Sequence, residues 1–185
     1  MKQNINKSLK IIGLSAILFT LSFATCKKDI AIVRKAEAHI EATNTLTPLT
    51  GLLTFTQIDN GKVKMQLDIT VPSHAGQSIA VHIHEHGMCG NAGGDAHGHW
   101  NPSGALHGKW GSSSFHAGDI GNISLDANGK GTLTLETDLW SIGGSDSTKN
   151  ILHRAIIVHG GIDDYLTQPS GNAGPRIGCG EIHEH

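Results

Sequence analysis

Two histidines separated by a single residue, His82 and His84, are the residues whose types and spacing most clearly suggest chemistry. They fall in the alternating segment 79–84, IAVHIH, where side chains two positions apart project from the same face of a strand. Two imidazoles on one face can coordinate the same metal ion, and imidazole nitrogen suits copper and zinc better than magnesium or calcium. The pattern therefore predicts redox or hydrolytic chemistry at a transition metal.

More histidines follow along the chain, and they can contribute only if the segments around them fold back toward this strand. They are His99, His107, His116 and His159. Two stretches around them, 87–118 and 160–175, are rich in glycine and small polar residues. Loops of that length are uncommon in compact domains and are usually functional or disordered.

Short strands are predicted for the rest of the chain after the first 25 residues. The alternating or β-rich runs are 35–42, 52–58, 63–69, 122–125, 131–135, 151–158 and 176–182. Asn60-Gly61 and Asn128-Gly129 lie between neighbouring runs and are typical of β-hairpin turns. With no convincing helical period, the fold class is all-β, an antiparallel sandwich or barrel with two long loops. The order in which the strands pair cannot be read from the pattern.

The first 25 residues resemble an export signal. Three lysines precede the apolar segment 11–23, which is too short to span a bilayer. Two interpretations remain open: cleavage after Ala24, or a lipoprotein signal in which Cys26 is the first mature residue and carries a lipid. Both predict an exported protein in the periplasm or cell envelope, and the second adds a membrane tether.

The remaining chain divides into a short tether, 26–34, and a single domain, 35–185. Removal of three lysines from the signal leaves 11 Lys and Arg against 16 Asp and Glu, a formal charge of −5 with neutral histidines. Because no basic stripe is present, nucleic acid is not expected as a partner.

Three cysteines are present, Cys26, Cys89 and Cys179. If Cys26 is lipidated, the other two are left to pair in an oxidising compartment, closing a loop of about 90 residues worth about 4 kcal/mol on a chain-entropy model. Three free buried thiols are the alternative.

Several motifs, taken together, resemble the copper/zinc superoxide dismutase family, from about residue 48 to 182. They are the His-x-His pair, His99-Trp100-Asn101-Pro102, His116-Ala117-Gly118-Asp119-Ile120-Gly121-Asn122, and Gly171-Asn172-Ala173-Gly174-Pro175-Arg176-Ile177-Gly178-Cys179-Gly180. A lone His-x-His would be a weak signal, but the full set in this order is specific.

The resemblance implies a Greek-key β-sandwich, or flattened eight-stranded barrel, with two adjacent metal sites. The implied copper ligands are His82, His84, His99 and His159, and the implied zinc ligands are His99, His107, His116 and Asp119. In the same way Asp163 corresponds to an aspartate that hydrogen-bonds ligands of both metals, and Cys89 and Cys179 correspond to the family disulfide.

The activity implied is conversion of superoxide to dioxygen and hydrogen peroxide as copper alternates between Cu(II) and Cu(I), with zinc in a structural role. Arg176 would orient the anion, and His99 would deliver a proton. The alternative is a non-catalytic periplasmic copper- and zinc-binding protein on the same scaffold, with extra ligands such as His86, His97 and the C-terminal His183 and His185. A homodimer is compatible with the family. The other histidines, including His39, His74 and His153, are expected at the surface.

Overall fold

The computed structural model describes residues 33–58 and 61–185, and within them antiparallel β-strands predominate. The strands are β1 (Lys35–Ala42), β2 (Thr50–Gln57), β3 (Val63–Thr70), β4 (Ser78–His84), β5 (Gly121–Ser124), β6 (Lys130–Thr137), β7 (Ala155–His159), β8 (Arg176–Glu181) and β9 (His183–Glu184). Two short 3₁₀ helices, η2 (Pro72–His74) and η3 (Asn91–Ala96), interrupt the loops. No helix in these two ranges is long and apolar enough to cross a membrane.

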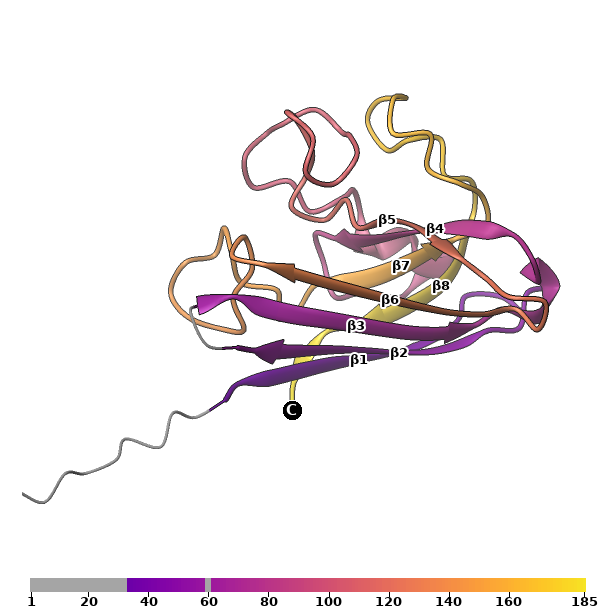
Figure 1. The fold of residues 1–185 in the computed structure, drawn as a ribbon, viewed down its shortest axis with the longest axis horizontal. Helices are drawn as coiled ribbons and strands as arrows, with labels where there is room; N and C mark the ends of the chain where they lie inside the picture. Colours follow the sequence, from indigo (N-terminus) through magenta and orange to yellow (C-terminus); the bar gives the residue numbers. More distant parts are fainter. Residues whose placement is uncertain (1–32, 59–60) are drawn as a thin grey trace, which may run out of the picture. The chain divides into compact units, whose positions relative to one another are not determined.

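The strands pair in the order β5-β4-β7-β8-β1-β2-β3-β6, with β9 added to β1. β3 and β4 are consecutive in the chain but lie far apart in this order, as do β6 and β7, which is the Greek-key type of connection. β5 and β6, at the two edges, are joined by a tight turn in which Asp126 accepts hydrogen bonds from the backbone of Asn128 and Lys130. The sheet is thereby an eight-stranded, nearly closed barrel, as predicted (Figure 1).

Apolar and polar residues alternate along the strands, and the apolar side chains fill the core. In β3, Val63, Met65, Leu67 and Ile69 are buried, and the residues between them are exposed or partly so. β4 differs because six of its seven residues are buried. Ile79, Val81 and Ile83 belong to the hydrophobic core, so the intervening His82 and His84 face the opposite side of the strand. Their burial requires a cover on that side.

The two long loops provide this cover. Figure 1 shows the loop between β4 and β5 and the loop between β7 and β8 rising on the same side of the barrel. Gly118 lies so close to β4 that a side chain there would overlap the carbonyl oxygen of Ile83, and its own N–H donates to Trp100. Both long loops were predicted, and both approach the β4 face.

The predicted strands are confirmed with one correction. The prediction of a strand over 151–158 was wrong for its first part, since β7 begins at Ala155. His153 adopts a positive φ of 61°, and the Arg154 side chain bonds the carbonyl of Asn150, so this segment turns instead of extending. The predicted signal segment, Cys26 and most of the tether lie outside the described residues, as does Asn60 of the first hairpin turn.

Candidate metal centre

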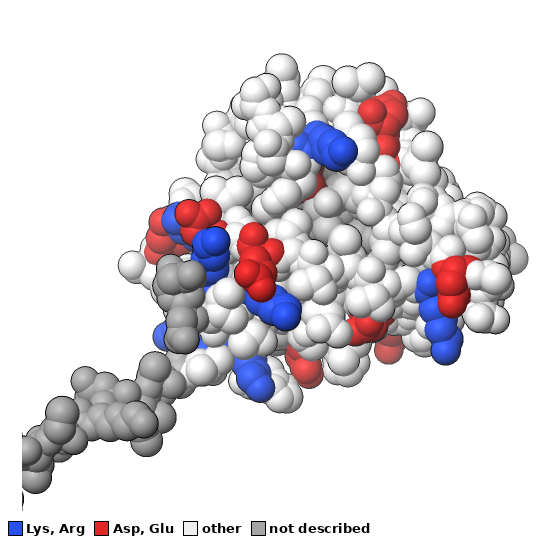
Figure 2. Space-filling model, viewed as in Figure 1, with Lys and Arg blue, Asp and Glu red and all other residues white. Residues whose placement is uncertain are grey.

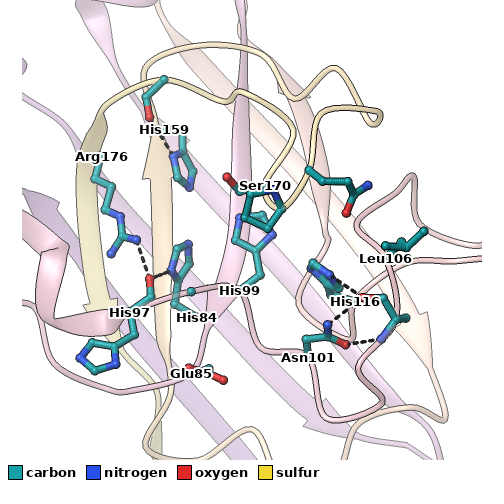
Figure 3. Close-up of a pocket in the computed structure, with 15 residues that line it drawn as sticks. His84, Glu85, His97, His99, Asn101, Leu106, His116, His159, Ser170 and Arg176 are labelled. Carbon is teal, nitrogen blue, oxygen red and sulfur yellow. Dashed lines mark hydrogen bonds between the residues drawn. The ribbon is translucent and has the colours of Figure 1, made fainter.

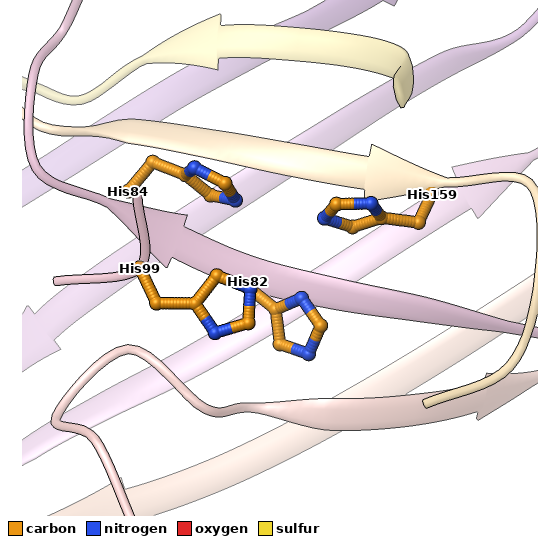
Figure 4. A group of neighbouring side chains, drawn as sticks. All are labelled: His82, His84, His99 and His159. Atoms are coloured by element: carbon orange, nitrogen blue, oxygen red, sulfur yellow. The ribbon is translucent and has the colours of Figure 1, made fainter. Parts of the chain in front are cut away.

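The copper-type histidines come from three elements that the sheet brings together. His82 and His84 lie on β4, and β7 runs antiparallel beside it, with Val158 opposite Val81, so His159 follows at the end of β7. An isolated bridge pairs His84 with His99, which carries the β4–β5 loop back along β4. Figure 4 shows the four rings converging on one region.

These four side chains form a buried cluster. One ring nitrogen of each lies within 4.8 Å of the others, and His99, the most accessible, is 7% exposed. The ring centroids of His82 and His99 are 4.0 Å apart, and those of His84 and His159 are 5.7 Å apart. Four neutral nitrogen donors around one point are a coordination set suited to copper.

A second cluster shares His99. It contains His99, His107, His116 and Asp119, all buried and again with donor atoms within 4.8 Å of one another. Oxygens of Asp119 lie 2.8 Å from Nδ1 of His99, 3.0 Å from Nδ1 of His107 and 3.1 Å from Nδ1 of His116. Three nitrogens and one carboxylate make the closed four-ligand set of structural zinc. A tight turn, closed by the bond from Asp119 N–H to the His116 carbonyl, presents both residues to this cluster.

Unpartnered nitrogens test whether metals fit these clusters. Among the described side chains, six buried ring nitrogens make no hydrogen bond, although two of them, on His107 and His116, lie near the Asp119 carboxylate. The six are Nδ1 of His82, Nε2 of His84, Nε2 of His99, Nδ1 of His107, Nδ1 of His116 and Nε2 of His159. Buried polar atoms are rarely left unpaired, since each costs about 1–3 kcal/mol. Every one belongs to a histidine of the two clusters, so the donor sets fit a copper and a zinc ion.

The other nitrogen of each ring is held in place. His84 donates from Nδ1 to the carbonyl of His97 at 2.9 Å, His116 from Nε2 to that of Ala105 at 3.1 Å, and His159 from Nδ1 to that of Gly174 at 3.3 Å. Such partners select the tautomer that directs the lone pair toward the metal. Backbone carbonyls supply this role here, and sequence motifs give no signal for them.

Asp163 connects the two clusters. Its carboxylate accepts hydrogen bonds from Nε2 of His82 and Nε2 of His107, both at 2.9 Å. Asp163 is itself held by Asn122, whose side chain accepts from the Asp163 N–H and donates to its carbonyl. Sequence reasoning assigned no role to Asn122, although it ends the His-x-Gly-Asp-x-x-Asn motif. The same reasoning missed Gln168, whose amide bonds both the N–H and the carbonyl of His107.

Comparison with known proteins identifies the architecture. The family model for copper/zinc superoxide dismutase matches residues 49–182. This chain belongs to the copper/zinc superoxide dismutase family. Superoxide dismutase [Cu-Zn] 1 of Aquifex aeolicus is 32% identical over 176 residues, covering 92% of this chain and 96% of that protein. An extracellular superoxide dismutase [Cu-Zn] of Caenorhabditis elegans is 33% identical, covering 90% of this chain and 76% of that protein.

Solved structures of similar fold include proteins described in other terms. The clock protein EA4 matches with a TM-score of 0.70 and 32% identity, covering 80% of this chain and 93% of its own. A double mutant of a superoxide dismutase-like protein from Bacillus subtilis matches with a TM-score of 0.69 and 31% identity, covering 80% and 96%. Membership of the copper/zinc superoxide dismutase family therefore establishes the scaffold and its metal-binding character, and activity needs its own argument.

A cleft leads to the four-histidine cluster of this superoxide dismutase relative. It has a volume of about 870 Å³, and His84, His99, His159 and Arg176 are among the residues that line it (Figure 3). The Arg176 guanidinium donates to the carbonyls of Gly93 and His97, which belong to the β4–β5 loop. A fixed cation beside an open approach to the cluster is suited to guiding a small anion.

The disulfide secures the same loop. Cys89 and Cys179 are bonded, as the family resemblance implied, and 90 positions separate them in the chain. Cys179 lies on β8, three residues from Arg176, whereas Cys89 begins the segment whose carbonyls hold that arginine. The bond thus ties the loop to the strand that carries Arg176.

Burial keeps the clustered histidines neutral. It lowers the pKa of His84 to about 2 and that of His159 to about 3, with neighbouring imidazoles acting in the same direction. Burial also lowers the pKa of His99 to about 4, although the hydrogen bond to Asp119 opposes the shift. Burial resists ionisation of Asp119, yet contacts with His116 and His99 and two backbone N–H groups hold its pKa well below the usual range. Neutral imidazoles and an ionised carboxylate are the forms that bind metals.

Histidines outside the two clusters are at or near the surface, as expected. His39, His86, His97, His153, His183 and His185 are exposed, and His74 is partly exposed. The charged groups on the face drawn in Figure 2 are scattered, with both signs interspersed. Trp100 and Trp140 are buried in the core.

Proposed function

We propose that this chain is a superoxide dismutase, converting superoxide to dioxygen and hydrogen peroxide. The observation that carries the proposal is the pair of buried clusters sharing His99, of which the copper-type cluster opens to a cleft that also contains Arg176. A structural zinc site needs no opening, whereas a redox metal must be reached by its substrate. The cleft gives a small substrate access to the four-histidine cluster, whereas the cluster that contains Asp119 keeps a closed set of four donors.

The residues that would hold copper are His82, His84, His99 and His159, and those that would hold zinc are His99, His107, His116 and Asp119. Bound copper would supply a one-electron Cu(II)/Cu(I) couple, and zinc would supply a fixed positive charge and rigidity.

The protein's own residues account for anion binding and proton delivery. Arg176, fixed by two carbonyls, would attract superoxide into the cleft and orient it beside His84 and His159. His99 lines the cleft; its Nδ1 lies beside Asp119, and its Nε2 makes no hydrogen bond. Held through Nδ1, the ring can keep its orientation when Nε2 takes up a proton and passes it to the reduced oxygen species.

Metal content measured together with dismutase activity tests the proposal, using the wild-type protein and His99→Ala. We expect wild type to bind one copper and one zinc in the two buried clusters and to be active. His99→Ala removes a donor from both clusters, so it should bind less of each metal and lose activity. His74→Ala is the control, because this ring contacts Ser73 and belongs to neither cluster.

The alternative function is metal storage or buffering without catalysis. An exposed group of possible ligands, Glu85, His86 and His97, is the observation that favours it. A wild-type protein with full copper and zinc occupancy but no dismutase activity would replace the proposed function with this one.

We also propose that the protein is exported. The N-terminal pattern, the disulfide and the similarity to an extracellular relative support export. Lipid attachment at Cys26 and assembly as a homodimer stay predictions.

A further inference from the structure

A third group of ligand-type side chains lies outside the two buried clusters. Glu85, His86 and His97 are all exposed, and one donor atom of each lies within 4.8 Å of the others. None of them belongs to the family motifs that hold copper or zinc. Glu85 and His97 also line the cleft that leads to the four-histidine cluster.

Backbone pairing brings the two histidines together. From the His84–His99 bridge the segments continue side by side, with Glu85 N–H donating to the Gly98 carbonyl at 3.0 Å and His86 N–H to that of Ala96 at 3.3 Å. This pairing sets the rings of His86 and His97 face to edge, with centroids 4.7 Å apart and planes at 84°. Backbone hydrogen bonds between the two segments therefore position His86 beside His97.

We propose that Glu85, His86 and His97 form a third transition-metal site, which receives Cu(II) at the rim of the cleft for transfer to the four-histidine cluster. Two imidazole nitrogens and one carboxylate oxygen suit divalent copper, nickel or zinc, and among these copper binds most tightly to a given set of such donors. Because the three side chains are exposed, water completes the coordination. Such a site exchanges its ion more readily than a closed one.

A direct structural connection joins the rim site to the buried cluster. The carbonyl of His97 accepts hydrogen bonds from Nδ1 of His84, at 2.9 Å, and from Arg176. Figure 3 shows His97 beside both of them at the edge of the cleft, with Glu85 on the same side. An ion leaving His97 would thus enter the cleft next to His84, whose free nitrogen belongs to the four-histidine cluster.

The rim carries charges of both signs, since Arg154 donates to the Glu85 carbonyl, so selection of a cation depends on the ligand set and not on net charge. Arg176 is turned onto the backbone carbonyls of Gly93 and His97, and Glu85 provides a carboxylate in the exposed group. Transfer exchanges one set of metal–ligand bonds for another and changes no oxidation state. The destination rests on the copper site of the proposed function, whereas the rim site itself does not depend on dismutase activity.

The first experiment counts metal ions. The full chain, already loaded with copper and zinc, is titrated with Cu(II) and followed by calorimetry and electron paramagnetic resonance. We expect one additional equivalent of Cu(II) with a spectrum distinct from that of the buried ion. His86→Ala and Glu85→Gln should each weaken this binding by at least about tenfold.

The variant His97→Gly removes the third ligand with little backbone cost. His97 has a φ of 61° and a ψ of −140°, a conformation that glycine adopts readily, and the carbonyl that supports His84 is retained. His74→Ala is the matched control and should bind the additional equivalent as wild type does. Absence of that equivalent in wild type, or its persistence in all three rim variants, would overturn the site.

The second experiment measures transfer. Zinc-loaded, copper-free protein is mixed with a substoichiometric amount of Cu(II), and the absorbance of the buried copper is followed with time. We expect uptake in His86→Ala to be slowed several-fold relative to wild type and His74→Ala, with the same final copper occupancy. Equal rates would refute the transfer role, and failure of every protein to take up buried copper would refute the proposed copper site instead.

Discussion

At the scale of single residues, the chemistry depends on which nitrogen of each histidine is free. His82, His107 and His116 present Nδ1 to the clusters, whereas His84 and His159 present Nε2. Each choice follows from the partner of the opposite nitrogen, which is a carboxylate for His82 and a backbone carbonyl for His84. His99 differs because its two nitrogens face different clusters.

Asp163→Asn should weaken metal binding because one carboxylate accepts from two histidines. An asparagine offers one oxygen, so its amide N–H₂ would face the N–H of either His82 or His107. We expect copper or zinc affinity to fall by about 10–100-fold, measured by competition with a chelator. Asp164→Asn is the control, since this exposed carboxylate accepts hydrogen bonds from nearby groups of Leu166 and Thr167 and, among the described residues, from no histidine. Equal affinities in the two variants would contradict the bridging role.

The pKa shifts predict that the metal-free protein loses stability in mild acid. The folded pKa values of His84, His99 and His159 lie below the ordinary 6.5, so the unfolded chain takes up protons that the folded chain does not. This contribution to stability is present above about pH 6.5 and is lost as the pH falls toward the folded values, at roughly 1.4 kcal/mol per pH unit for each histidine. Urea unfolding of the chelator-treated protein between pH 7 and pH 5 measures it, and an unchanged midpoint would contradict it.

At the scale of elements, two loops and two strands must meet within a few ångströms. Gly171, in the β7–β8 loop, shows how close the approach is: a Cβ there would overlap the Asp163 carboxylate and lie 2.6 Å from Nε2 of His107. Its φ of 67° also favours glycine. The backbone at this point leaves no room for a side chain beside the hydrogen bond that joins the clusters.

Gly171→Ala should therefore displace the loop and lower zinc affinity, with a loss of more than about 3 kcal/mol of stability. Gly104→Ala is a matched control because its φ is 65° and nothing lies within 4 Å of the added methyl group. We expect the control to lose only about 1–2 kcal/mol, the cost of the left-handed backbone. Chemical unfolding and zinc content distinguish the two, and similar losses would show that the backbone angle alone matters.

At the scale of the whole domain, a packed core supports the strand that carries His82 and His84, and one disulfide ties the loop that contacts Arg176 to β8. The core side chains of β3 and β4 are fully or nearly fully buried, so the strands that carry His82 and His84 rest on a packed base. The loop that supplies Gly93 and His97 has a single disulfide linking it to β8. We therefore expect both the stability of the domain and the position of Arg176 to depend on the bond between Cys89 and Cys179.

Cys89→Ser should reduce both the unfolding free energy and the dismutase activity per bound copper. Opening a loop of 90 positions should cost about 4 kcal/mol of unfolding free energy on the chain-entropy model. Freed from β8, the loop should hold Arg176 less firmly, so activity per bound copper should fall. Cys26→Ser, which leaves the bond intact, is the control. Wild-type activity per copper in Cys89→Ser would show that the loop keeps its position without the bond.

The sequence by itself determined the fold class and indicated the residues that we propose hold the metals. Ligand chemistry depends on side-chain type, and period-two alternation places His82 and His84 on one face of a strand, so both can be read from the order of residues. The seven candidate ligands form two buried clusters, Arg176 lines the cleft, and Cys89 and Cys179 are bonded.

Only the tertiary structure decided what orients those ligands. Backbone carbonyls of His97, Ala105 and Gly174 fix three of the rings, and every residue has a carbonyl, so no residue type marks these positions. The meeting of His86 with His97 likewise depends on the pairing of two segments whose register is a property of the folded sheet. Contacts made by backbone, and distances between segments remote in the chain, exist only once the chain has folded.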